Sequence, residues 1–450
     1  MVSDYHKILR ESMNKVKIRL FVLGIICCWV VVLVAGVFAG GYEWGGLGPR
    51  ACGMGGAFIG VANDWTAPYW NPAGLTQTKG IGVGIELLQP NYKAKDGNSI
   101  ANLDPAEMNI DQGDIFARIY PVEDTLFEKT EVSESFYHPC VGGFFDLKGI
   151  KIGAGFYVPV GDWFDWEDKI TDPTNAEINA SYFTSMWLLV GNLSLAKEII
   201  PDFSFGVGLN ILYLKSKNEA KKSYKDSNIP SLIDYEFKYL TEGSGTAFEG
   251  TFGVMYKPLP VISVGAVYRT GSEISLDGSG EYSHSHPLTP PDESSDYTQK
   301  FYHPATYGIG LACRPTTKLL LALDWHKTDW STWKTDMDFK TEGVVLTDKD
   351  IDWDWKVSNR YRFGGEYKLK EEIALRGGFY YDESPVPDEQ VSFTNIADVD
   401  RKGITLGAGY GWKKFMFDFL YEYHWGDREV NDIKYSQKIN AYTLALSYQL

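Results

Sequence analysis

The feature that most constrains the fold is an alternation of apolar with small or polar residues, which recurs over many segments of about ten residues. In the segment FSFGVGLNILY (203–213), the odd positions carry Phe, Phe, Val, Leu, Ile and Tyr, whereas the even positions carry Ser, Gly, Gly, Asn and Leu. The segment FMFDFLYEYHW (415–425) repeats the pattern. Because successive side chains of a strand point to opposite faces, each segment is predicted to be a β-strand with one apolar face.

The second face of these strands distinguishes a membrane barrel from a soluble β-sandwich. In a sandwich, the face opposite the core is solvent surface and is rich in Lys, Glu, Thr and Ser. Here that face combines small residues with single charges: Gly265 with Arg269, Asp324 with His326, Gly364 with Arg362 and Glu366, and Gly378 with Arg376. Such a face suits a crowded polar interior, and the apolar face suits lipid. The pattern therefore favours a transmembrane barrel over a soluble sandwich.

Counting the alternating segments predicts an all-β fold, an antiparallel transmembrane β-barrel of about 14 strands over residues 79–450. The strands are predicted to start near residues 79, 136, 150, 181, 201, 245, 260, 299, 317, 356, 372, 401, 414 and 438. Short connections are predicted at 146–149, 196–201, 257–260, 314–318, 368–372 and 411–414, with long polar connections between the pairs. An even strand number places both ends of the barrel on the short-turn, periplasmic side.

The first 39 residues have the pattern of a cleaved signal peptide. A basic stretch (Lys15, Lys17, Arg19) precedes an apolar run over 20–34, and small residues end at Ala39. This order predicts export and cleavage after Ala39. The alternative is an uncleaved membrane anchor, because residues 20–39 are long enough to span a bilayer.

Residues 40–78 are predicted to form a hatch, a plug inside the barrel. The segment starts on the periplasmic side directly beneath the lumen, so it either hangs free or folds inside. It carries too many large apolar side chains for a disordered tail. We expect Phe58, Trp65, Tyr69 and Trp70 to pack against the lumen wall.

Composition excludes several classes of function. The formal net charge of −16 is unfavourable for binding nucleic acid. The cysteine spacing gives neither a disulfide framework nor a zinc site, and no metal site or cofactor is predicted. Asp162, Asp165 and Asp168 could ligate calcium, but a solvated loop is the simpler interpretation. Asp324 and His326 could form a catalytic dyad, yet charge lining a lumen explains them more simply, so no enzyme activity is predicted.

Several blocks of the sequence resemble the FadL/TodX family of outer-membrane transporters for hydrophobic compounds. They are GPRACGMGGAFIGVANDWTAPYWNPAGL (48–75), GAGFYVPVGDW, GSGTAFEGTFGVMYKPLP, ISVGAVYRTG, LLALDWHKTDWSTW and LRGGFYYDESPVPD. The resemblance implies passive uptake through a Gram-negative-type outer membrane, with long-chain fatty acids or aromatic hydrocarbons as cargo. It further implies capture in a groove among the outer loops, a pocket above the hatch, and lateral exit at a kinked third strand. The alternative is a structural or secretion-associated barrel of the same fold that transports no lipid.

The resemblance places the hatch motif at Asn71, Pro72 and Ala73. It places the kinked third strand at 151–160, where Pro159 with Gly161 gives a chemical reason for a kink, because proline cannot donate to the ladder. A plain barrel rim would also tolerate proline there. The expected partners are the cargo and outer-membrane lipid, and a monomer is expected.

Two sets of residues are candidates for contacts with cargo. The first is a loop over 215–242 that is rich in apolar side chains, which either form a groove or pack against neighbouring loops. Its residues are Ile229, Leu232, Ile233, Tyr235 and Phe237. The second set contains cations for a fatty-acid carboxylate, each of which could instead balance a lumen carboxylate. These are Arg50, Arg269, Arg314, Arg362 and Arg376.

Overall fold

The computed structural model describes residues 45–95, 131–171, 176–226, 235–285, 292–391, 399–430 and 433–450. The predicted signal peptide and the groove candidates Ile229, Leu232 and Ile233 lie outside these ranges. Within them, no helix is both long and apolar enough to cross a bilayer.

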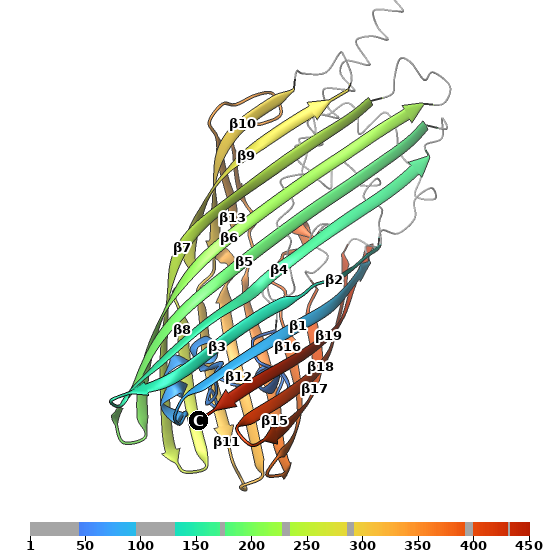
Figure 1. The fold of residues 1–450 in the computed structure, drawn as a ribbon. Coiled ribbons are helices and arrows are strands. Elements are labelled where there is room, and N and C mark those ends of the chain that lie inside the picture. Colours follow the sequence, from blue (N-terminus) through green and yellow to red (C-terminus); the bar gives the residue numbers. More distant parts are fainter. Residues whose placement is uncertain are drawn as a thin grey trace, which may run out of the picture.

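The strands form one closed antiparallel barrel of fourteen strands, as predicted (Figure 1). Nine strands are continuous: β1 Gly82–Lys95, β4 Ile150–Thr171, β5 Ala176–Ile200, β6 Phe203–Asp226, β7 Tyr235–Leu259, β16 Ile373–Asp382, β17 Arg401–Trp412, β18 Phe415–Val430 and β19 Ile433–Gln449. Five consist of two pieces each: β2 Glu131–Ser135 with β3 His138–Leu147, β8 Ile262–Arg269 with β9 Ser272–His284, β10 Glu293–His303 with β11 Thr306–Cys313, β12 Leu319–Asp329 with β13 Lys334–Phe339, and β14 Lys349–Asp352 with β15 Val357–Lys370.

The barrel closes where its first strand meets its last. β1 pairs antiparallel with β19 from Gly82 opposite Gln449 to Lys95 opposite Ser436. The backbone N–H of Leu450 also donates to the carbonyl of Ile81 at 2.8 Å. The C-terminus and the start of β1 thus share the short-turn end, as expected from an even strand number.

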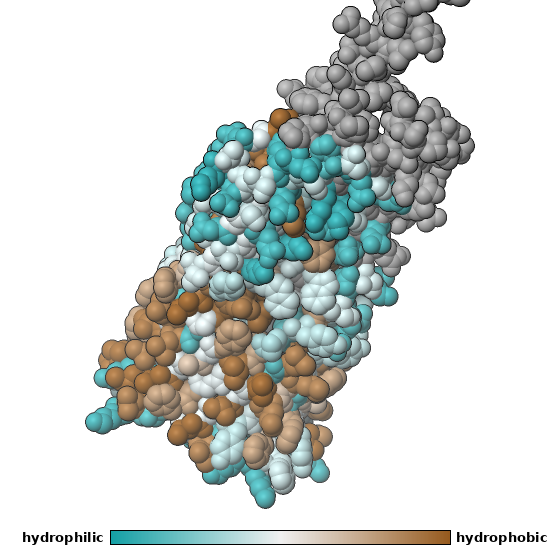
Figure 2. Space-filling model, turned by 45° about the horizontal axis from the view of Figure 1, so that its top comes forward, coloured by the Kyte–Doolittle hydropathy of each residue, from teal (hydrophilic) through white to brown (hydrophobic). Residues whose placement is uncertain are grey.

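The two faces of the strands are oriented as the alternation predicts. On β18, Phe417 and Phe419 are 45% and 43% exposed, whereas the intervening Asp418 is 8% exposed. Figure 2 shows the outward apolar side chains gathered in one half of the barrel and hydrophilic residues covering the other. Tyr361 and Tyr381, which stack on the neighbouring strands β15 and β16, lie toward the strand ends that are away from the short turns. This arrangement is typical of a lipid-facing surface with an aromatic girdle.

The barrel wall differs in height around its circumference (Figure 1). The tall wall, β4 to β7, has strands of 22 to 25 residues, whereas β16 and β17 have 10 and 12. Two predictions were wrong because the strands of the tall wall extend farther than expected. Tyr235 and Phe237 belong to β7 and not to a loop, because β6 and β7 stay paired as far as Tyr224 opposite Tyr235. The stretch containing the three aspartates 162, 165 and 168 is likewise part of β4.

Candidate functional site

Residues 45–78, here called the inner segment, lie inside the barrel near the short turns (Figure 1). They form α2 Pro49–Cys52, α3 Ala67–Trp70 and the 3₁₀-helix η1 Pro72–Gln77. Each helix has a proline in its first turn, where the missing N–H costs no hydrogen bond. The Asp64 carboxylate accepts from the backbone and hydroxyl of Thr66 at 2.9 and 2.6 Å and fixes the turn before α3. Most of these residues are buried.

The inward glycines of the barrel make room for the inner segment. A Cβ at Gly378 would lie 2.0 Å from the backbone nitrogen of Gly55, and one at Gly364 would lie 2.1 Å from the carbonyl oxygen of Met54. A Cβ at Gly206 would lie 2.4 Å from the nitrogen of Ala73. Real side chains do not approach backbone this closely, so these strands need glycine where the inner segment touches them.

The motif Asn71, Pro72, Ala73 lies within the inner segment and against the tall wall. Asn71 is fully buried. Its amide donates to the carbonyls of Ile59 at 3.1 Å and Val254 at 3.0 Å, and its side-chain oxygen accepts from the backbone of Ala73 at 3.1 Å. All these partners are protein backbone. The geometry therefore gives Asn71 a role in holding the segment together and to β7.

Lumen carboxylates hold the backbone of the inner segment at two further points. Asp324 on β12 accepts from the N–H groups of Phe58 and Ile59 at 2.6 and 2.7 Å. Glu86 on β1 accepts from the N–H of Gly48 at 2.9 Å. Hydrogen bonds from backbone N–H to a carboxylate are among the strong ones in proteins. This use of Asp324 supports the structural interpretation of the Asp324 and His326 pair.

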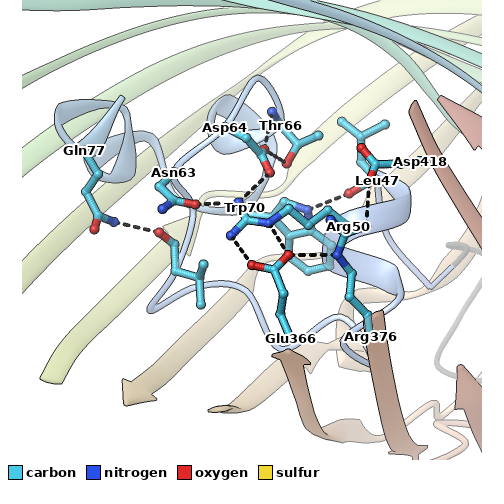
Figure 3. A network of polar contacts seen from close by, with 11 residues as sticks. Leu47, Arg50, Asn63, Asp64, Thr66, Trp70, Gln77, Glu366, Arg376 and Asp418 are labelled. Carbon is cyan, nitrogen blue, oxygen red and sulfur yellow. Dashed lines mark hydrogen bonds and ion pairs between the residues drawn. The ribbon is translucent and has the colours of Figure 1, made fainter. Parts of the chain in front are cut away.

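Arg50 is the centre of an ion-pair network between the inner segment and the barrel (Figure 3). Its guanidinium binds both carboxylate oxygens of Glu366, at 2.8 and 3.0 Å, and donates to Asn63 at 2.7 Å. Glu366 also accepts from Arg376 at 2.8 Å, and Arg376 pairs with Asp418 at 2.5 Å. Burial alone would lower the pKa of Arg50, but the ion pair with Glu366 outweighs burial and raises it, so this cation stays charged.

The predicted packing aromatics all contact the lumen wall or one another. The ring of Trp65 occupies the space that a Cβ at Gly84 would need. Trp70 donates through its indole N–H to the carbonyl of Leu47 at 2.7 Å and meets Phe58 edge to face at 6.1 Å. Together with the glycine contacts and ion pairs, these rings fill the lower lumen, the part of the barrel interior that the inner segment occupies.

Three arginines and an aspartate lie close together on β15, β16 and β17, farther from the short turns than the inner segment. The strand register places Arg360 opposite Asp382, and Asp382 opposite Arg401. Arg401 donates to Asp382 at 2.9 Å, while Arg362 reaches both Asp382 at 3.4 Å and the carbonyl of Gly55 at 3.2 Å. Among the described residues, the Nε and Nη1 atoms of the buried Arg401 have no hydrogen-bond partner. We call Arg360, Arg362, Arg401 and Asp382 the arginine cluster; its formal charge is +2.

The five arginines proposed from the sequence occupy different positions. Arg50 and Arg376 belong to the network of the lower lumen. Arg314 lies in the short turn between β11 and β12, where its backbone N–H donates to the carbonyl of Val261 at 2.8 Å. Arg362 belongs to the arginine cluster, and Arg269 contacts Tyr69. Arg360 and Arg401 were missed, and counting residues back from the turn after Lys370 would have placed Arg360 opposite Glu383, because a register shift between Lys368 and Lys370 moves the pairing by one residue.

Farther along the strands from the short turns, the interior is lined by large apolar side chains. We call this region the upper lumen. Trp333 and Trp355 stack at 5.1 Å, and Phe301 meets Trp333 edge to face at 5.0 Å. Other buried members of the lining are Tyr92, Phe136, Phe164, Tyr239, Tyr282, Tyr297 and Trp330.

The third strand carries a bulge beside the inner segment. Tyr157 pairs with Val190 and Val160 with Leu188, so that Val158 and Pro159 oppose only Leu189. Two residues opposite one bend a strand and interrupt its ladder. Gly161 is beyond the bulge and pairs again, with Trp187.

The neighbouring ladder ends at the same level. β3 and β4 pair only as far as Val141 opposite Phe156, and within the described ranges no backbone pairing joins β2 to β4. A cavity of about 20 Å³ lies here, between the inner segment (Gly46, Leu47, Tyr69) and the bulge. It is large enough for about one water molecule. The backbone ladder is therefore interrupted beside the inner segment, and a hydrogen bond between His138 Nδ1 on β3 and the Val158 carbonyl on β4, at 3.1 Å, bridges the interruption.

Comparison with known proteins gives consistent matches. A family model described as "Outer membrane protein transport protein (OMPP1/FadL/TodX)" matches residues 34–448. The long-chain fatty acid transport protein of Salmonella typhi is 24% identical over 290 residues, which cover 58% of this chain and 66%, just under two thirds, of that protein. A putative outer membrane protein of Neisseria meningitidis serogroup B is 24% identical over 443 residues, covering 89% of this chain and 88% of that protein.

Two solved structures share the fold. A FadL homologue of Pseudomonas aeruginosa superposes with a TM-score of 0.69 at 15% identity, and the toluene transporter TodX of P. putida with a TM-score of 0.68 at 16% identity. Each match covers 91% of this chain and 99% of the other. At this identity the superpositions establish the architecture alone.

Proposed function

The chain belongs to the OMPP1/FadL/TodX family of outer-membrane transport proteins, and we propose that it takes up long-chain fatty acids passively across the bacterial outer membrane. In this proposal the inner segment acts as a hatch, the upper lumen receives the cargo, and the cargo leaves sideways at the third strand. The relatives named for long-chain fatty acid transport and for toluene both support a hydrophobic cargo.

The observation that carries the proposal is the break in the barrel wall beside the inner segment. A closed barrel pairs every strand, because an unpaired backbone group in lipid is costly. Here the ladder between β3 and β4 stops at Phe156, and Pro159 offers no N–H to continue it. An opening at this level leads into the bilayer, where an apolar molecule is soluble, and bypasses the filled lower lumen.

The arginine cluster supports a fatty acid over an aromatic hydrocarbon. An alkyl chain suits the aromatic upper lumen, while a carboxylate suits a buried guanidinium with unused donors. Arg401 supplies such donors through Nε and Nη1. A hydrocarbon would leave these buried polar groups without a partner, which is unfavourable.

Labelled palmitate and toluene provide the test, with the purified protein in lipid vesicles. The native Cys140 on β3 lies one residue beyond the last pair and would oppose Tyr157 if the ladder continued. In a Tyr157→Cys variant that lacks the other cysteines, oxidation is expected to close the break and abolish palmitate uptake, and reduction to restore it.

The matched control places cysteines at Val141 and Phe156, which are already paired. A disulfide there is expected to leave uptake unchanged. Palmitate uptake that persists in the oxidised Tyr157→Cys variant, with its disulfide to Cys140 formed, would contradict lateral exit. Absence of uptake for both cargoes would favour a structural barrel instead.

A further inference from the structure

A groove of about 850 Å³ lies on the lipid side of the barrel wall, and no step of the proposed uptake uses it. The register of neighbouring strands connects its lining residues in a row across the barrel: Ile373, Tyr410, Phe417, Leu446 and Ile85. Most of these side chains are large, apolar and exposed. Ala408 belongs to the next row and is a small outward residue between Leu406 and Tyr410, so it gives the groove depth. We call this feature the lipid-side groove.

The lipid-side groove rises obliquely through the apolar band. One end is at Ile373, the first residue of β16 after a short turn, and the other is at Pro139, eight residues from Leu147 at the short-turn end of β3. Between them the groove crosses about 24 Å of wall and, with strands tilted as in other barrels, climbs about 15 Å. This climb is about half of the hydrocarbon thickness, the depth that an acyl chain of one leaflet occupies. The groove therefore has the inclination and depth of a single lipid chain.

The short-turn end of the lipid-side groove is at the level of the lipid headgroups. Trp412, two residues beyond Tyr410 on the same face of β17, is 50% exposed and stacks with Phe415 at 6.4 Å. The Lys413 ammonium lies 4.8 Å from the centre of the Trp412 ring. Exposed rings with a lysine beside them are typical of a membrane–water interface. A phospholipid whose chain lies in the groove therefore has its headgroup near Lys413.

Basic residues gather at this end of an otherwise acidic chain. Six short connections together hold nine basic and four acidic residues, a net charge of +5 in a chain of −16; they are 146–149, 196–201, 257–260, 314–318, 368–372 and 411–414. Two of them adjoin at the groove, where the N–H of Gly411 donates to the carbonyl of Glu372 at 2.7 Å. Their charged residues give a local net charge of +2: Lys368, Lys370, Glu371, Glu372, Lys413 and Lys414. Lysines near a membrane surface attract anionic headgroups.

We propose that the lipid-side groove binds one acyl chain of an anionic phospholipid from the periplasmic leaflet, and that Lys413 and Lys414 bind its phosphate. A second copy of this chain would need no cations at one end of an apolar groove, whereas a phospholipid has that asymmetry itself. The lysines repel the ammonium of a zwitterionic headgroup, so the anionic lipid binds more tightly. The site is independent of the proposed uptake, because it needs neither cargo nor movement of the inner segment.

The test titrates the full protein in detergent with phosphatidylglycerol or phosphatidylethanolamine, which carry the same acyl chains and differ in headgroup charge. Native mass spectrometry counts the bound lipid. For the unmodified protein we expect one tightly bound phosphatidylglycerol, with a Kd about tenfold lower than that of phosphatidylethanolamine. In Lys413→Gln with Lys414→Gln, the two Kd values should become about equal. Lys148→Gln with Lys318→Gln removes the same charge from other short turns and should leave both Kd values unchanged.

A second variant tests the apolar part of the site and keeps the experiment decisive if the lysine variant does not fold. Ala408→Trp fills the lipid-side groove, so it should raise the Kd of both lipids about tenfold or more. Ala266→Trp is the matched control, because Ala266 lies outside the groove on β8, opposite the exposed Ile309. Equal Kd values for the two lipids in the unmodified protein, or a Kd of phosphatidylglycerol that is the same in Ala408→Trp and Ala266→Trp, would refute the site. Dimers that only Ala408→Trp dissociates would assign the groove to a second copy of the chain instead.

Discussion

The lower and upper lumen are built on the same strands but with opposite chemistry. In the lower lumen the inward positions include glycines and charged residues, and several of them contact a defined atom of the inner segment, as Gly378 and Glu366 do. In the upper lumen the inward positions are large rings such as Tyr297 on β10 and Phe339 on β13, which contact one another. The lower half is specified by individual polar contacts and the upper half by apolar area, so substitutions in the two halves should differ in kind.

The largest effect on ion conductance is expected where a glycine of the lower lumen gains a side chain. In Gly378→Leu the new side chain would collide with the backbone of Gly55, whose distance from a Cβ would be 2.0 Å. Overpacking of this kind costs about 1–3 kcal/mol or more, and displacement of the inner segment relieves it. Ion conductance across a planar bilayer should therefore rise clearly. Gly377→Leu is the matched control, because a Cβ there meets nothing closer than 3.9 Å.

Removal of one charge from the Arg50 network is expected to loosen the inner segment. Glu366→Gln leaves Arg50 and Arg376 without their shared carboxylate, and breaking such a buried pair costs about 3–5 kcal/mol. The thiol of Cys52 reports the change, because burial raises its pKa and keeps it unreactive. Maleimide should label Cys52 faster in Glu366→Gln.

The corresponding exposed pair is a control for this charge effect. Arg428 binds Asp388, which is 70% exposed, at 2.5 Å. Exposed pairs contribute about 0–1 kcal/mol, so Asp388→Asn should leave Cys52 labelling unchanged. Equal labelling rates in both variants would contradict the assignment of the Arg50 network to the inner segment.

A polar substitution at the border of the upper lumen should affect cargo and not the inner segment. Arg401→Gln removes a charged hydrogen-bond donor worth about 1.5–3 kcal/mol to a carboxylate, so the Kd for palmitate should rise by about tenfold or more. The Kd for toluene should stay the same. Equilibrium binding to the detergent-solubilised protein measures both, and an unchanged Kd for palmitate would argue against the arginine cluster as the carboxylate site.

The smallest effect is expected for a ring in the upper lumen. Trp355 is buried, and its indole N–H has no partner among the described residues, so Trp355→Phe should shift the unfolding free energy by less than about 1 kcal/mol. Trp353 donates to Thr335 at 3.0 Å, and Trp353→Phe should cost about 1 kcal/mol more. Urea unfolding in lipid vesicles compares the two.

The sequence was most informative about the lower half of the barrel. There one strand face contacts lipid and the other contacts the inner segment, so apolar and small residues alternate strictly and the strand starts at residues 150 and 401 were predicted without error. The crowded interior inferred from Gly364 and Gly378 has a specific cause, the close approach of Met54 and Gly55. Alternation is a local property, and a single sequence displays it.

The upper half and the site depended on information that is not local. Beyond the membrane, β7 carries charged residues such as Glu236 and Lys238 opposite its rings, instead of the small residues found in the lower half, so its start was placed at residue 245 instead of Tyr235. Arg360, Asp382 and Arg401 are single charges on three strands, and only the register brings them together. The bulge at Pro159 was expected from its chemistry, but the simultaneous end of the β3 ladder could not be inferred from residue types.

The uneven height of the wall determines how far from the membrane the apolar interior extends. A strand of 25 residues, tilted as in other barrels, rises about 60 Å, whereas one of 10 residues rises about 25 Å, close to the bilayer thickness. The tall wall therefore projects about 35 Å beyond the bilayer. A poorly soluble molecule therefore meets the protein in water, before it reaches the lipid headgroups. The distance that it must diffuse through water without contact with the protein is shorter by the same amount.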